Sequence, residues 1–214
     1  MSTALSRKYY LLSLLLILLH IVGAVGCMLD FSRSWMLMLT PVNLLISASI
    51  LIYNHEASKK KLFLFLALSG AIGFIVELMG VKTGMIFGSY EYGNTLGMKL
   101  WDVPIIIGIN WFILSYAFGC ITKHLRIHFV LKSIIAASMM TLLDFLIEPV
   151  AIYLDYWSWE NNEIPIQNYL GWFITALLIQ LLFHKFDFNA KNQVSKILII
   201  SQLIFFTSLF IYLL

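Results

Sequence analysis

Long apolar stretches separated by short polar ones dominate this chain of 214 residues. A helix needs roughly 20 apolar residues to cross the hydrocarbon core of a bilayer. Seven stretches approach or reach that length: residues 9–28, 35–53, 62–79, 103–122, 129–148, 169–185 and 197–214. Because 61% of the residues are hydrophobic and only 12% are charged, a soluble globular protein is excluded. The sequence predicts an all-α fold, a polytopic membrane helical bundle of about seven transmembrane helices, with residues 1–214 forming a single integral-membrane domain.

The distribution of positive charge predicts the orientation of this bundle. With seven crossings, one face collects 11 of the 14 Lys and Arg residues, namely Arg7, Lys8, Lys59, Lys60, Lys61, Lys123, Arg126, Lys132, Lys185, Lys191 and Lys196. The other face receives Arg33, Lys82 and Lys99. Cytoplasmic loops of membrane proteins are enriched in Lys and Arg. We therefore expect a multi-pass protein of the cell membrane with a cytoplasmic N-terminus and an extracytoplasmic C-terminus. The first stretch is expected to remain as an anchor, because it continues through Val25 without a cleavage pattern.

Three carboxylates lie inside the apolar stretches. Glu77 and Asp144 each lie 15 residues from the cytoplasmic start of their stretch, which places both about 22 Å from that boundary. Glu148 lies one turn beyond Asp144 on the same helix face, and Asn110 enters the same layer from the other side. Each ionisable group in the hydrocarbon costs about 2.5–3.5 kcal/mol on insertion scales. We expect the three acids to face one another across a cavity, with at least one of them protonated at neutral pH and able to act as a general acid.

Two long connections, 80–102 and 149–168, are irregular and rich in Gly, Tyr, Trp and Asn, and both are expected on the extracytoplasmic side, near the acids. Pro149 predicts that the fifth helix ends or kinks at Glu148. Trp157 and Trp159 share one face if their segment is extended. These aromatic residues fit either an interfacial belt or a wall that stabilises a cation.

Other polar residues have simpler interpretations. The acids could serve only as hydrogen-bonding groups that join two helices. His20 is isolated from other ligand types and is interpreted as a hydrogen-bonded interior residue. No metal, nucleotide or serine-hydrolase motif is present in the sequence, so no metal and no cofactor is expected. Nucleic acid is an unexpected partner for a chain with a net charge of only +3.

Two ordered blocks of sequence resemble one known family. The first runs from Glu77 to Tyr92 (ELMGVKTGMIFGSYEY) and continues with Gly97, Val103, Pro104 and Trp111. The second consists of Asp144, Glu148, Pro149, Ala151, Trp157, Trp159, Ile164, Pro165, Asn168, Gly171 and Trp172. Together they span residues 77–172 and are similar to the signature of the membrane-embedded carotenoid hydratases, or carotenoid biosynthesis proteins. Two positions depart from that pattern: Asp155 and Glu163 stand where glycine is usual. Both are loop positions, so they bear on substrate preference and loop shape more than on chemistry.

The resemblance implies an enzyme, a hydro-lyase of the carotenoid 1,2-hydratase type. It would add water to the C1–C2 double bond of an acyclic ψ end group and give a tertiary 1-hydroxy carotenoid without a cofactor. Such hydration needs an acid in a dry site, a π-rich or negative wall and one held water. We assign Asp144 or Glu148 as the proton donor and Glu77 as the base that orients water. The substrate-binding candidates are Tyr90, Tyr92, Asn110, Trp111, Trp157, Trp159, Asn168 and Trp172.

The expected partners are a lipophilic carotenoid, water and the lipid bilayer, with other enzymes of the carotenoid pathway as further candidates. Two rival functions remain open. A carotenoid end-group cyclase would protonate the same alkene but would not add water. A small proton-coupled transporter would use the three acids as a relay, although only His20 and Gln180 offer polar groups near mid-membrane depth.

Overall fold

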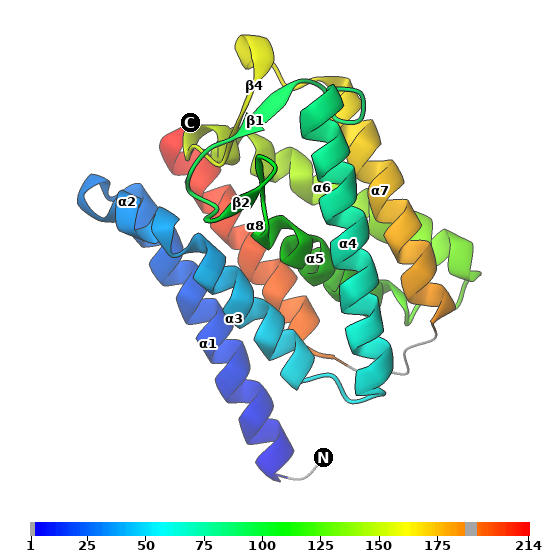
Figure 1. Cartoon of the computed structure of the whole chain (residues 1–214). Helices are drawn as coiled ribbons and strands as arrows, with labels where there is room; N and C mark the ends of the chain where they lie inside the picture. The colour runs from blue at the N-terminus through cyan, green and yellow to red at the C-terminus, as the bar shows by residue number, and fades with distance from the viewer. Residues whose placement is uncertain (1–2, 187–191) are drawn as a thin grey trace.

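The computed structural model describes residues 3–186 and 192–214, without the side chains of residues 3–6 and 161. Lys191, which was counted on the cytoplasmic face, lies outside this range. Eight α-helices account for most of the described chain: α1 (Thr3–Met28), α2 (Asp30–Met38), α3 (Thr40–Tyr53), α4 (Lys59–Thr83), α5 (Ile106–Thr122), α6 (Phe129–Tyr153), α7 (Ile166–Lys185) and α8 (Val194–Leu213). The start of α1 lies at the lower end of the bundle in Figure 1 and the C-terminus at the upper end.

The all-α membrane bundle is confirmed. Among the described residues, the helices α1, α4, α6, α7 and α8 are each long and apolar enough to cross a membrane. Only 28% to 44% of each spanning window is buried inside the protein. Large apolar side chains such as Leu142, Ile174 and Ile204 are more than 60% exposed. Apolar side chains exposed in this number fit a surface covered by lipid.

The second predicted stretch, 35–53, is not one continuous helix. It is divided between α2 and α3, which meet at Leu39 with a bend of 53°, as in a broken span or a re-entrant loop. Pro41 lies in the first turn of α3, where its ring is tolerated but prevents the preceding helix from continuing. No described residue of α2 is buried. The start of the fourth stretch also differs, because Val103 and Pro104 form a strand and α5 begins at Ile106.

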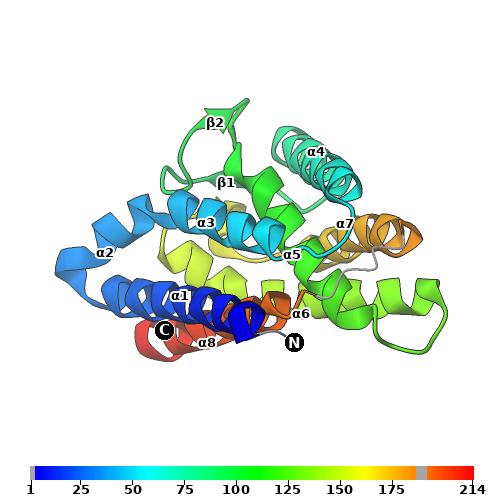
Figure 2. The ribbon, with the colours of Figure 1, turned by 90° about the horizontal axis from the view of Figure 1, so that it is seen from below.

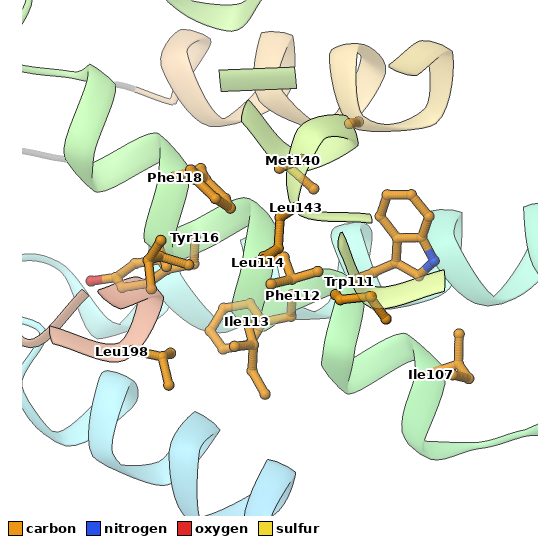
Figure 3. Packing of buried hydrophobic residues seen from close by; sticks show 14 of the residues in the cluster. Ile107, Trp111, Phe112, Ile113, Leu114, Tyr116, Phe118, Met140, Leu143 and Leu198 are labelled. Atoms are coloured by element: carbon orange, nitrogen blue, oxygen red, sulfur yellow. The ribbon is translucent and has the colours of Figure 1, made fainter. Parts of the chain in front are cut away.

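Helix α5 is the central element of the fold, in contact with α3, α4, α6, α7 and α8 (Figure 2). Its buried side chains pack with Met140 and Leu143 of α6 and with Leu198 of α8 (Figure 3). Helices α4 and α5 approach closely where Gly70 and Gly108 meet. A Cβ atom on Gly108 would lie 2.9 Å from the Gly70 carbonyl oxygen. Small residues allow such backbone contact between membrane helices.

The two long connections are irregular over much of their length, as expected, but they also contain short strands, which the sequence analysis did not predict. Strand β1 (Tyr90–Tyr92) pairs antiparallel with β4 (Trp157–Trp159), and we call this pair the ribbon. Strand β2 (Lys99–Leu100) pairs with β3 (Val103–Pro104) as a hairpin, and a 3₁₀ turn, η1 (Glu160–Asn162), follows β4. The ribbon lies at the upper end of the bundle, on the same side as the C-terminus (Figure 1).

Pro149 does not end its helix, so the predicted helix end at Glu148 was wrong, while the alternative of a kink there stays a prediction. Helix α6 continues through Pro149 to Tyr153. Proline removes one backbone donor and so costs one helical hydrogen bond. The turn that follows contains Val150, Ala151 and Leu154, which are at most 1% exposed. Burial of these side chains offsets that local cost, since tertiary packing routinely overrides local propensity.

Candidate active site

Glu77 of α4 is surrounded by hydrogen-bond donors. The hydroxyl groups of Tyr90 and Tyr92 donate to its Oε2 atom at 2.6 and 2.7 Å. The indole N–H of Trp111, on α5, donates to Oε1 at 3.0 Å. The residue is only 4% exposed. Three donors directed at one carboxylate are the arrangement that stabilises its negative charge.

Gly73 makes the Trp111 contact possible. A Cβ atom at this position would lie 2.3 Å from Cγ of Trp111, a distance at which one of the two must move. Trp111 also stacks on Trp172 of α7, with ring centroids 4.5 Å apart and an interplanar angle of 28°. The indole is therefore held between α4 and α7 with its N–H directed at Glu77.

Glu148 of α6 has an equivalent set of three donors. The indole N–H groups of Trp157 and Trp159 donate to its Oε2 atom at 3.0 and 2.9 Å. The Asn168 amide, on α7, donates to Oε1 at 2.8 Å. The expectation that the two tryptophans share one face of an extended segment is confirmed, since β4 directs both toward the same carboxylate.

The ribbon connects the two glutamates. In its register Tyr90 faces Trp159 and Tyr92 faces Trp157, with ring centroids 5.1 and 6.2 Å apart. Residues two apart on a strand point to the same side. All four aromatic rings therefore lie on one face of the ribbon, where the β1 pair binds Glu77 and the β4 pair binds Glu148.

Asp144 has a different environment from the two glutamates. It is fully buried and receives one described hydrogen bond, at 3.1 Å, from the same Asn168 amide that binds Glu148. Its Oδ1 atom has no partner among the described residues. Asn168 thus bridges two acids that lie four residues apart on α6.

A small cavity lies between Glu77 and Glu148, with a volume of about 30 Å³. A site of roughly 10–15 Å³ on this scale accepts one water molecule, so this one holds about one or two. We call it the acid pocket. It is lined by Glu77, Phe87, Tyr90, Tyr92, Ile107, Asn110, Trp111, Glu148, Trp157, Trp159, Asn168 and Trp172. Asp144 does not line it, so only two of the three acids face this cavity as expected.

The structure brings the remaining predicted site residues together here, in roles that differ in part from those predicted. Tyr90, Tyr92, Trp111, Trp157 and Trp159 are predicted as substrate-binding residues, yet each also donates a hydrogen bond to a carboxylate. Sequence reasoning missed Phe87 and Ile107 as lining residues. Phe87 lies inside the first signature block, which is the signal that could have identified it.

The two ribbon tyrosines remain neutral donors. Burial, together with the nearby Glu77 carboxylate, raises the pKa of Tyr90. The same two causes raise the pKa of Tyr92 well above its ordinary value. Both hydroxyl groups therefore keep their protons at physiological pH and cannot serve as bases there.

His20 is a hydrogen-bonded interior residue, as predicted: its Nδ1 atom lies 2.8 Å from the Leu16 carbonyl oxygen, and the residue is 6% exposed. Within residues 3–186 and 192–214, no three His, Cys, Asp or Glu side chains are grouped as metal ligands would be.

Comparison with known proteins gives a family. The profile of the family described as "Carotenoid biosynthesis protein" matches residues 33–214. Bisanhydrobacterioruberin hydratase of Haloarcula japonica is 31% identical over 121 residues, which covers 50% of this chain and 40% of that relative. The match thus spans less than half of the relative's length. No solved structure matches. Since the profile covers well over half of the chain, including the acid pocket, the protein belongs to the carotenoid biosynthesis protein family.

Proposed function

We propose that the protein is a carotenoid hydratase that adds water to the C1–C2 double bond of an acyclic ψ end group. The observation that supports this most directly is the acid pocket, where two carboxylates with full sets of donors enclose room for about one or two water molecules. The 31% identity to a hydratase supports the reaction class. The product would be a tertiary 1-hydroxy carotenoid.

The Asp144–Glu148 pair is the proposed source of the proton. Two carboxylates bridged by one amide in a buried site are costly when both are ionised, so the pair retains a proton. Glu148 lines the acid pocket and Asp144 does not. Glu148 therefore delivers the proton to the less substituted alkene carbon, and Asp144 is a positioning residue that shares the proton through its proximity.

Glu77 is the proposed base. Its three donors favour the ionised form, and Oε1 accepts only one described hydrogen bond, which leaves a lone pair for water. As the tertiary cation forms, the water oxygen attacks it and Glu77 accepts the water proton. Asn110 lines the pocket without a described hydrogen-bond partner and is placed to hold the same water. The rings of the ribbon stabilise the cation through their π faces.

We propose further that the ribbon end of the bundle is extracytoplasmic in the cell membrane. The 11-to-3 charge distribution supports this orientation. A cysteine introduced at Asn94, in the connection between β1 and β2, should react with an impermeant thiol reagent added to intact cells. A cysteine at Lys60 should react only after the membrane is opened. The reverse labelling pattern would show that the orientation is wrong.

The test of the reaction is to express the protein in cells that supply lycopene or a monocyclic carotenoid with one ψ end. The expected product has gained one water per processed end by mass spectrometry. A product of unchanged mass but altered retention time would instead support the cyclase alternative. Recovery of unchanged substrate, with the protein inserted normally in the membrane, would refute the proposal.

A further inference from the structure

Helix α2 has an apolar face that the rest of the protein leaves uncovered. Phe31, Trp35 and Met38 are 80%, 66% and 69% exposed. Trp35 and Met38 lie four and seven residues after Phe31, a spacing that places all three side chains on one side of a helix. We call these three side chains the α2 stripe.

The opposite side of α2 is fixed to the end of α1. The Ser32 hydroxyl donates to the Gly26 carbonyl oxygen at 2.9 Å, and Nε of Arg33 donates to the Cys27 carbonyl oxygen at 2.8 Å. Both bonds satisfy carbonyl groups in the last turn of α1 that have no partner within the helix. Met36 packs so closely on Gly26 that a Cβ atom there would overlap the Met36 side chain. These contacts hold α2 in place and leave the α2 stripe directed away from the bundle.

The exposed surface of α2 is itself divided into an apolar and a polar half. Asp30 and Ser34 are exposed beside the α2 stripe, and the Asp30 side chain is 91% exposed even though its carboxylate lies 2.9 Å from Arg33. With 3.6 residues per turn, Ser34 lies about 60° and Asp30 about 100° to the same side of Phe31. A carboxylate in hydrocarbon costs about 2.5–3.5 kcal/mol. The polar half therefore requires water or headgroups, whereas the apolar half favours lipid.

Helix α2 begins where a membrane span ends. The span of α1 runs from Arg7 to Met28, and α2 starts at Asp30, toward the ribbon end of the bundle (Figure 1). Figures 1 and 2 both show α2 at the edge of the molecule. Its nine residues cover only about 14 Å, less than half of a hydrocarbon core of about 30 Å. The helix is thus too short to cross the membrane and lies at its boundary.

We propose that α2 is an interfacial helix that binds phospholipid at the ribbon end of the bundle, with the α2 stripe among the acyl chains and Asp30 and Ser34 in the headgroup layer. Amphipathic helices of this kind lie in the plane of the interface with Trp and Phe toward the acyl chains. The last two turns of α1, which precede α2, also expose apolar side chains, namely Val22 and Val25. Lipid is therefore already expected beside the stripe, which favours lipid over a protein partner. Helix α2 is then neither half of a broken span nor part of a re-entrant loop.

Fluorescence quenching at single positions tests this placement. The full chain carrying Trp35→Cys or Ser34→Cys is labelled with an aromatic thiol probe and reconstituted in phosphatidylcholine vesicles. The quenchers are iodide in the water and a phospholipid with a nitroxide on its acyl chain. Because the two positions lie about 100° apart around a helix about 10 Å wide, nitroxide quenching should be about threefold or more stronger at position 35. Iodide quenching should be stronger at position 34 by a similar factor.

Two further positions give the reference values. Asn94→Cys, in the exposed connection after β1, reports on water, and Leu142→Cys, on the exposed face of α6, reports on lipid. The native cysteines, Cys27 and Cys120, are buried, and wild-type protein treated with the same reagent measures any labelling of them.

Three results would each overturn the proposal. If iodide quenches position 35 as strongly as position 94, the α2 stripe is in water. If position 34 is shielded from iodide as completely as position 142, α2 is immersed in the hydrocarbon as a re-entrant segment. If position 35 is shielded from both quenchers, a protein surface such as a second copy of this chain covers the stripe.

A second measurement tests whether the lipid contact holds α2 in place. In the same vesicles, the variant with both Phe31→Ser and Trp35→Ser should exchange the amide hydrogens of α2 about tenfold or more faster than the wild-type protein, because it loses two large apolar side chains from lipid. The matched control is Ser34→Ala, which changes the polar half of the same helix and should leave exchange near the wild-type rate. Equal exchange in the double variant and the wild-type protein would also overturn the proposal. Neither measurement requires turnover, so both are independent of the hydratase proposal.

Discussion

The acid pocket and a second cavity, which we call the arm cavity, differ in size, polarity and origin. The acid pocket, at about 30 Å³, has donors directed at both of its carboxylates. The arm cavity, at about 260 Å³, is lined mainly by α1, α3, α5 and α8 and is mostly apolar. Every residue that lines the acid pocket lies within 77–172, the signature region. Much of the arm cavity is built by α1, α3 and α8, outside that region.

This difference separates chemistry from substrate choice. A pocket whose carboxylates already accept hydrogen bonds is preorganised for a reaction and needs only water and an alkene. A larger, mostly apolar cavity determines which shapes fit beside that pocket. Substitutions in the two cavities are therefore expected to change different properties, the reaction rate in one case and the choice of substrate in the other.

The largest effect is expected from the two carboxylates of the acid pocket. Glu148→Gln and Glu77→Gln keep the size of the side chain but replace one acceptor oxygen by an amide N–H donor and remove a proton donor or base, so turnover should fall by about 10²- to 10⁴-fold. Insertion and folding should survive, since a costly buried charge is removed. Both should be measured as kcat on membranes with equal protein content.

Asp144 provides the contrast within the same layer. Asp144→Asn should also reduce turnover, because the pair loses its shared proton, whereas Asp144→Leu should disturb packing as well. If all three amide variants insert normally and hydrate the ψ end near the wild-type rate, the acids serve only to join helices. The acid pocket would then have no catalytic role to set it apart from the arm cavity.

A smaller effect is expected from one donor of the acid pocket. Tyr92→Phe removes the hydroxyl that binds Glu77 at 2.7 Å. A hydrogen bond to a charged group contributes about 1.5–3 kcal/mol, so kcat should fall by roughly 10- to 150-fold. The control is Tyr116→Phe, since Tyr116 is also buried but its hydroxyl contacts His55 and Asn192, away from the pocket. Equal losses in the two variants would indicate a general packing effect.

Substitution of one glycine beside each cavity shows, through the thermal stability of the protein, how tightly the two sites are packed. Gly73→Ala places a methyl group 2.3 Å from Trp111, whereas Gly23→Ala places one 3.3 Å from Phe205. Overpacking of a tight site costs about 1–3 kcal/mol. We expect Gly73→Ala to lower the thermal midpoint of the detergent-solubilised protein clearly and Gly23→Ala to change it little. A larger loss for Gly23→Ala would mean that the arm cavity is the more tightly packed of the two.

The smallest effect concerns the two departures from the family pattern. Asp155 has φ = 56°, a left-handed conformation that glycine adopts without strain. Asp155→Gly should therefore stabilise the loop before β4, by less than the roughly 1–2 kcal/mol that a left-handed conformation costs a residue with a Cβ atom, because aspartate tolerates it better than most. Glu163 has φ = −118°, an extended conformation open to any residue, so Glu163→Gly should not stabilise. Thermal unfolding of both variants checks the contrast, and a loss of turnover in either would place that residue in the site.

Much of the acid pocket could be predicted from the sequence, because the depth of a side chain in the membrane follows from the number of helical residues between it and the end of its helix. Glu77, Asp144, Glu148 and Asn110 were placed in one layer by helical rise alone, and all of them except Asp144 line the pocket. The ribbon could not be predicted in this way, because strands of three residues have too few positions to show a pattern. The donor role of Trp111 was also hidden, since sequence does not reveal which way an indole N–H points.

The arm cavity was beyond sequence reasoning for a different reason. It is the space left where helices far apart in the chain fail to fill the volume between them, and no local pattern encodes such a gap. His20 was interpreted as an isolated polar residue and Gln202 was not singled out, since α1 and α8 lie at opposite ends of the sequence. Their common cavity exists only because those two helices pack side by side.

The ribbon has a consequence for how the two reactants arrive. It covers the acid pocket at the end of the bundle where the chain leaves the apolar layer, while the arm cavity lies among the helices. Water dissolves poorly in hydrocarbon, and a carotenoid dissolves poorly in water. Under our proposal, water reaches Glu77 from the aqueous side of the ribbon, and the polyene reaches Glu148 from the lipid side. The two reactants would then meet at the boundary between the membrane and water. The rate would depend on the carotenoid concentration in the membrane rather than in the surrounding solution.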